Sequence, residues 1–233
     1  MQDIKDDMNA LVNAHTQREN DNSHSIRFAS DASPEALRSK IGVSSDYVQK
    51  TGHQWYVLRI TYNRTDKAHS MVANSGLQWY LPMHYVLKKE IGKKKRILKP
   101  LLPNLFFVYA TREAADAFVK KKGDVPQIIK YYRDKTKPME QDGKHPPMII
   151  SHYAMTNFIR VTNTESAHVR VVLPQQCHFK SGDNVRVIGG EFEGTTGKVA
   201  RIAGQQRVVV EITGLCMVAT AYIPSRFIEP IVE

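Results

Sequence analysis

FKSGDNVRVIGGEFEGTTGKV, residues 179–199, decides how the C-terminal part of this chain folds. Val185 and Val187 alternate with polar residues, which predicts a strand with one apolar face. Gly197 lets the next strand begin close to its neighbour, because a glycine has no side chain to clash there. Short strand-like runs separated by tight turns predict a small β-barrel. These runs cover 184–188, 196–202, 206–213, 217–223 and 227–228.

Phe192 stands in a loop between two glycines of the same stretch. We expect its ring to be exposed at the rim of the barrel, and an exposed aromatic side chain is typical of a protein contact. The alternative is that the ring only fills the loop.

The middle of the chain alternates strand and helix patterns. Strand-like runs at 55–60, 78–87, 105–109 and 125–132 are rich in aromatic and β-branched residues. Helices are expected after Thr65 or Asp66, after Thr111 and after Ser151, because each of these residues can cap a helix N-terminus. This order predicts an α+β fold, in which an antiparallel sheet carries helices on one face.

Composition shifts divide the chain into four parts. Residues 1–52 are polar and predict a largely flexible N-terminal extension. Residues 53–165 hold the α+β pattern, 166–176 read as a linker, and 177–233 hold the predicted barrel.

The charge and the residue counts limit the functions that this chain can have. The chain has 33 Lys and Arg against 23 Asp and Glu, a formal charge of +10, which favours a polyanion such as nucleic acid as partner. There is no apolar run long enough for a membrane span and no apolar signal segment, so we expect a cytoplasmic protein. Two cysteines and scattered histidines form no metal motif, and no phosphate loop or nucleophile elbow occurs. We therefore expect no enzymatic activity, no cofactor and no metal.

Two motifs in sequence order resemble a known family. Residues 179–199 resemble the KOW motif, and KPLLPNLFFV at 99–108, with Trp55-Tyr56-Val57, resembles the N-terminal (NGN) domain of NusG-type transcription elongation factors. The resemblance covers residues 53–233 and implies an NGN domain followed by a small SH3-like β-barrel, the KOW domain. The C-terminal segments QQRVVVE and VATAYIP are similar to the UpxY branch of specialised NusG paralogues. That branch acts in antitermination on surface-polysaccharide operons of Bacteroides-like bacteria.

The family binds the clamp helices of RNA polymerase through an apolar patch on the NGN sheet and suppresses pausing. Carried over by motif, this patch comprises Leu102, Pro103, Leu105 and Phe107, with Tyr131 on a neighbouring strand. Family members usually have an aromatic residue where Leu105 stands. The alternative is that this run is simply core.

Basic residues are expected to contact nucleic acid. Seven of them crowd around Gly92, and contacts with phosphates are expected from Lys93, Lys94, Lys95 and Arg96. Specialised family members also read non-template DNA with residues near the first helix, where this chain has Arg64, Lys67 and His69. The alternatives are a solvated loop and a merely polar helix face.

The resemblance implies RNA polymerase and the non-template DNA of the transcription bubble as partners. It leaves open whether the KOW domain recruits a protein of the small ribosomal subunit, Rho or neither. We expect a monomer with no membrane partner. The rival interpretation is an RNA- or ribosome-binding KOW protein whose barrel carries the binding.

Overall fold

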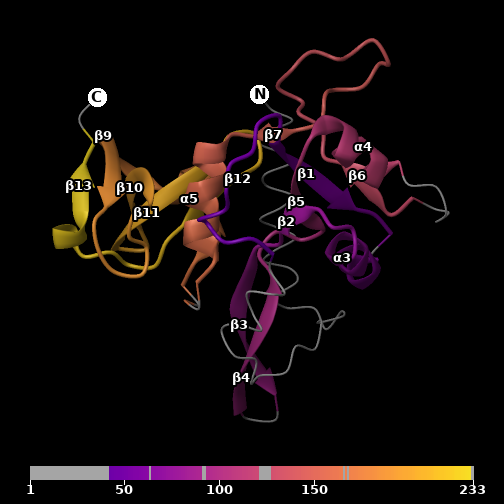
Figure 1. Cartoon of the computed structure of the whole chain (residues 1–233). Coiled ribbons are helices and arrows are strands. Elements are labelled where there is room, and N and C mark those ends of the chain that lie inside the picture. The colour runs from indigo at the N-terminus through magenta and orange to yellow at the C-terminus, as the bar shows by residue number, and fades with distance from the viewer. Residues whose placement is uncertain are drawn as a thin grey trace.

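The chain forms two antiparallel sheets, a helix that contacts both, and a separate two-stranded hairpin (Figure 1). The computed structural model describes residues 42–62, 64–90, 93–120, 127–164, 166 and 168–231, and it leaves the side chains of 87–96 and 179–183 undescribed. Within these ranges no helix combines the length and the apolar character that crossing a membrane requires. The α+β fold class predicted from the sequence is confirmed.

The first sheet is built around two strands, β1 (Gln54–Ile60) and β5 (Leu105–Ala110), which pair antiparallel. Three short strands complete it: β2 (Gln78–Tyr80), β6 (Ile129–Tyr131) and β7 (Ile149–Ile150). Every residue of β5 is buried. A strand that is apolar at every position needs cover on both faces of its sheet.

Helices cover both faces of this sheet, so the expectation of helices on one face is wrong. On one face, His69 of α3 (Thr65–Ala73) packs edge-on against Phe106, with ring centroids 6.4 Å apart. Helix α4 (Arg112–Val119) lies on the same face. On the other face, Phe158 of α5 (His152–Thr162) packs against Phe107 at 5.4 Å.

The predicted N-cap residues are confirmed for two of the three described helices. The side chains of Thr111 and Ser151 cap α4 and α5 by accepting hydrogen bonds from backbone N–H groups. Helix α3 instead has Arg64 at its N-cap, without a capping side chain, so the expected cap at Thr65 or Asp66 is wrong.

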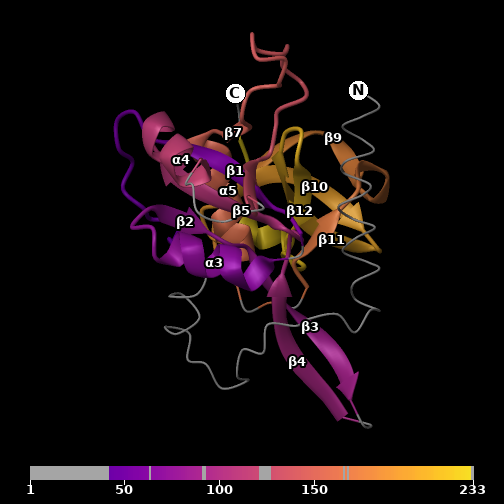
Figure 2. The same ribbon diagram turned by 90° about the vertical axis from the view of Figure 1, so that its right-hand side faces the viewer.

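A long hairpin projects from the first sheet (Figure 2). It consists of β3 (Met83–Glu90) and β4 (Lys93–Pro100), paired from Met83 opposite Pro100 to Glu90 opposite Lys93. The single strand expected at 78–87 is therefore divided into β2 and β3. Pro82 stands at the break, where its carbonyl accepts a hydrogen bond from the Leu101 N–H at 2.8 Å.

The second sheet has six strands in the order β13-β9-β10-β11-β12-β8. Their bounds are β8 (Arg170–Val172), β9 (His178–Val187), β10 (Thr196–Ile202), β11 (Gln205–Ile212), β12 (Cys216–Ala219) and β13 (Ile228–Pro230). Among the described residues, no pairing of β13 with β8 closes this sheet into a barrel. A Cβ on Gly197 would lie only 2.4 Å from the Val209 carbonyl oxygen, which confirms why the strand needs glycine there.

Parts of two segments expected to be loosely attached are packed instead. Strand β8 lies within the expected linker 166–176, yet it pairs with β12 as an edge of the second sheet. Within the expected N-terminal extension, the Val43 N–H donates to the Trp79 carbonyl at 2.9 Å. Tyr47 packs against Trp55 at 5.2 Å, and a 2.6 Å hydrogen bond joins its hydroxyl to His152 Nδ1. The part of the predicted flexible extension that precedes residue 42 lies outside the described residues.

Candidate functional site

The hairpin concentrates positive charge at the point farthest from the two sheets. Its register places Lys88 opposite Lys95 and Lys89 opposite Lys94. Like charges at directly opposite positions destabilise a strand pair. Such a hairpin gains stability when a polyanion neutralises the repulsion, so the arrangement suits contact with nucleic-acid phosphates.

The proposed polymerase patch is not an exposed surface. Leu102 and Phe107 are fully covered, and Leu105 is 2% exposed, whereas Pro103 is half-buried. Helix α5 covers Phe107, because Phe158 packs against both Phe107 and Tyr80. For Leu105 and Phe107 the alternative interpretation, that the run is core, is therefore correct in this arrangement.

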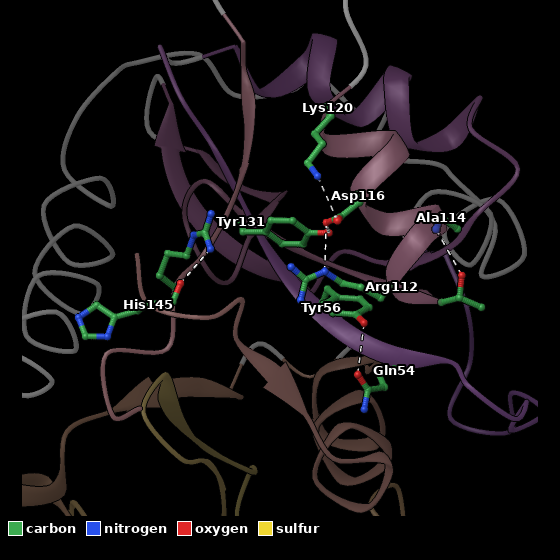
Figure 3. Close-up of polar contacts among 10 residues, drawn as sticks. Gln54, Tyr56, Arg112, Ala114, Asp116, Lys120, Tyr131 and His145 are labelled. Carbon is green, nitrogen blue, oxygen red and sulfur yellow. Dashed lines mark hydrogen bonds and ion pairs between the residues drawn. The ribbon is translucent and has the colours of Figure 1, made fainter. Parts of the chain in front are cut away.

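Tyr131 lies on the opposite face of the sheet from Leu105 and Phe107. Both Phe106 and Tyr131 pair with Leu58, which puts them on the face that α4 covers. The Tyr131 hydroxyl donates to Asp116 Oδ1 at 2.8 Å (Figure 3). The five residues of the predicted patch are therefore not brought together.

Asp116 is the centre of a small charged network on α4. Arg112 Nε lies 3.1 Å and Lys120 Nζ lies 3.2 Å from its carboxylate oxygens (Figure 3). Burial alone would raise the pKa of Asp116, but its hydrogen bonds with Tyr131 and Lys120 and the Arg112 charge lower it overall. Burial, reinforced by the Asp116 carboxylate, raises the pKa of Tyr131. This network holds α4 to β6 and leaves Tyr131 unavailable for a partner.

The basic residues around α3 are divided between surface and interior. Arg64 and Lys67 are exposed, as nucleic-acid contacts require. His69 instead turns towards Phe106, and its Nε2 is buried without a hydrogen-bond partner. Burial lowers its pKa, although the nearby Asp66 charge opposes the shift. The assignment of His69 to DNA contact is therefore not supported by its position.

Phe192 is 5% exposed, so the expectation of an exposed rim aromatic is wrong. Its loop docks on α5 instead of projecting into solvent. Arg160 Nη1 donates to the Gly194 carbonyl at 2.8 Å, just beyond Phe192 in the sequence. The alternative interpretation, that the ring only fills its loop, is therefore correct.

Helix α5 holds the second sheet through residues that the sequence analysis missed. The Asn157 Nδ2–H group donates to Thr196 Oγ1, and its Oδ1 accepts from the Thr196 N–H, both at 2.8 Å. The hydroxyl groups of Tyr153 and Thr196 are also hydrogen-bonded. Tyr153, Asn157 and Arg160 follow the i, i+4, i+7 spacing of a second helix face, and this spacing could have revealed the contact.

The described residues offer little for covalent or metal chemistry. They contain no group of three or more His, Cys, Asp or Glu side chains placed to hold a metal ion. Burial raises the pKa of Cys177 to about 11 and that of Cys216 to about 12. Both thiols therefore stay protonated near neutral pH, and a protonated thiol is a poor nucleophile.

Comparison with known proteins identifies a family for the middle of the chain. Residues 53–153 match the NusG family, described as "Transcription termination factor nusG", and the match covers the first sheet, the hairpin and the start of α5. No curated protein matches the chain. NusG proteins are non-enzymatic transcription factors that generally bind RNA polymerase. The match supports the assignment of this chain, over residues 53–153, to the NusG-type transcription factors.

Proposed function

We propose that this protein regulates transcription elongation and antitermination by binding the RNA polymerase clamp and suppressing pausing or termination. The NusG match across residues 53–153 carries this proposal. The similarity of 205–211 and 218–224 to the UpxY branch supports surface-polysaccharide operons as targets. The protein would act in the cytoplasm, as a monomer.

The hairpin is the proposed contact with nucleic acid. Lys93, Lys94, Lys95 and Arg96 lie on β4, at or near the tip of the projecting hairpin (Figure 1). A basic hairpin beside the polymerase cleft would reach the phosphates of the transcription bubble and release counterions from them. The exposed residues Arg64, at the N-cap of α3, and Lys67, within α3, are the proposed contacts with non-template DNA.

The clamp contact is proposed at the base of the hairpin. Pro103 follows β4 closely and is half-buried, and Val86 and Ile97, which pair across the hairpin, are also partly exposed. Together they offer apolar surface beside the basic tip. Leu102, Leu105 and Phe107 are buried, so in this proposal they do not touch polymerase.

Recruitment of a ribosomal protein or Rho is assigned to the second sheet. Phe192 is too buried to make this contact, whereas Ile188 is 48% exposed. Ile188 adjoins Gly189 and Gly190, on which the Phe227 ring packs. We propose that Ile188 and Phe227 contact the second partner.

The decisive experiment measures binding of the full chain to a paused elongation complex over a range of salt concentrations. Replacing Lys93, Lys94 and Lys95 by Gln should reduce the slope of log affinity against log salt by about 2–3, since each phosphate contact contributes roughly 0.7–0.9. The matched control replaces Lys135, Lys137 and Lys144, three exposed lysines of another loop. An equal slope change in both triple variants would contradict a specific role of the hairpin.

A capture experiment separates this function from the rival. The full chain, immobilised in cell lysate, should retain core RNA polymerase. Retention of ribosomal subunits without polymerase would instead support the RNA- or ribosome-binding interpretation.

A further inference from the structure

We propose that a cavity between α5 and the second sheet binds a small zwitterion with an apolar side chain, such as an α-amino acid. The cavity has a volume of about 310 Å³. Small-molecule sites in proteins begin at roughly this size, about 300 Å³. Tyr153, Ala154 and Asn157 line it from α5, and residues of β10, β11 and β12 line it from the sheet. This inference does not depend on the proposed function.

Two opposite charges stand on the sheet side of the cavity. Lys198 pairs with Val209 and Glu211 pairs with Met217, and Val209 and Glu211 are two residues apart on β11. Because side chains two apart on a strand point the same way, all four lie on one face. Both charged side chains are exposed, and neither has an ion-pair partner in the described part of the chain. A ligand that carries a carboxylate and an ammonium group would satisfy both.

Apolar surface lies between and beside the charges. Val209 and Met217 are 2% and 6% exposed and form a floor. Tyr153 is 66% exposed, while its hydroxyl is held by Thr196. The ring of Tyr153 therefore stands as a wall with a free surface, and an apolar side chain fits between this wall and the floor.

Hydrogen bonds hold the two sides of the cavity together without a ligand. The two 2.8 Å hydrogen bonds between Asn157 and Thr196 hold α5 against β10 at one end of it. A preformed site avoids the entropy cost of ordering its walls on binding. Because the walls come from α5 and from the second sheet, a bound ligand would also strengthen the contact between them.

The test titrates three probes into the isotopically labelled full chain and follows amide signals by NMR. L-leucine carries both charges, L-leucinamide lacks the carboxylate, and N-acetyl-L-leucine lacks the ammonium group. We expect saturable shifts at the cavity with L-leucine and at least tenfold weaker binding of the other two, because each loses a charge-assisted hydrogen bond. Lys198→Gln should weaken L-leucine about tenfold but leave L-leucinamide unchanged. Glu211→Gln should weaken L-leucine similarly but leave N-acetyl-L-leucine unchanged.

Arg201→Gln is the matched control. Arg201 is exposed on the same strand as Lys198, but it is three residues away, so its side chain points to the face opposite the cavity. This variant should bind L-leucine like the unmodified chain. Absence of saturable shifts with L-leucine overturns the proposal, and so does equal binding of all three probes. The proposal is also overturned if the Lys198→Gln and Glu211→Gln variants bind L-leucine as tightly as the unmodified chain does, provided that their spectra show the native fold.

Discussion

Replacing Asn157 by alanine is expected to lower the free energy of unfolding by about 2–4 kcal/mol. Asn157 is 3% exposed and makes two hydrogen bonds to Thr196 on the second sheet. Losing the bond to Thr196 Oγ1 costs about 0.5–1.5 kcal/mol, and leaving the buried Thr196 N–H without a partner costs about 1–3 kcal/mol, together about 1.5–4.5 kcal/mol. The higher helix propensity of alanine returns up to about 0.7 kcal/mol.

Urea denaturation of the full chain measures this loss directly, together with the slope m. A single transition with unchanged m would show that both sheets still unfold together. Two separate transitions would show that the Asn157 contact is what couples them. Either pattern is compatible with the predicted loss of stability.

Asn163→Ala is the control on the same helix. Asn163 is the C-cap of α5 and partly exposed, and in the described structure its side chain makes no hydrogen bond. We expect its substitution to change stability by less than about 0.5 kcal/mol, as surface changes usually do. A loss below about 0.5 kcal/mol for Asn157→Ala as well would refute the claim that this contact holds the second sheet.

Three further predictions concern residues whose roles the structure revises. Phe107→Ala should destabilise the chain by about 3–5 kcal/mol because the ring is fully buried, and thermal melting measures this; a native melting temperature would restore Phe107 as a surface contact. Phe192→Ala should likewise lower the melting temperature, and selective loss of a second partner without destabilisation would count against its buried position. The pKa of Asp116 is lowered by its partners, so its contribution to stability is present above about pH 4 and is lost as the pH falls through the folded value. Asp116→Asn should flatten that acid-side loss in a pH series of urea melts, and an unchanged profile would show that the network contributes nothing.

Local patterns were sufficient to predict most individual elements. The strands at 54–60 and 105–110 follow from aromatic and β-branched runs, and the caps Thr111 and Ser151 follow from side-chain chemistry. These signals depend only on neighbouring residues. The role of Gly197 could also be predicted, because the neighbouring strand passes too close to its Cα for any side chain to fit.

The surfaces could not be predicted in this way. Leu105, Phe107 and Phe192 have the same apolar character whether a partner covers them or the chain does. The two-residue period of a strand predicts that Leu105 and Phe107 share one face of the sheet. Which helix covers that face depends on how the chain crosses the sheet, and the period does not contain this information. Residue spacing does not reveal the antiparallel register that puts Tyr131 on the opposite face from Leu105 and Phe107.

Most of the strands, two helix caps, the excess of positive charge and the order of an α+β unit followed by a β unit can be predicted from the amino-acid sequence. Those properties reside in periodicity, turn residues and composition, which are local. The position of α5 between the two sheets, in contact with both, is visible only in the folded chain (Figure 1). Its residues Phe158 and Asn157 point to different partners, each more than 35 residues away along the chain. The free energy of such contacts comes from residues that meet only after folding, so no local pattern contains it.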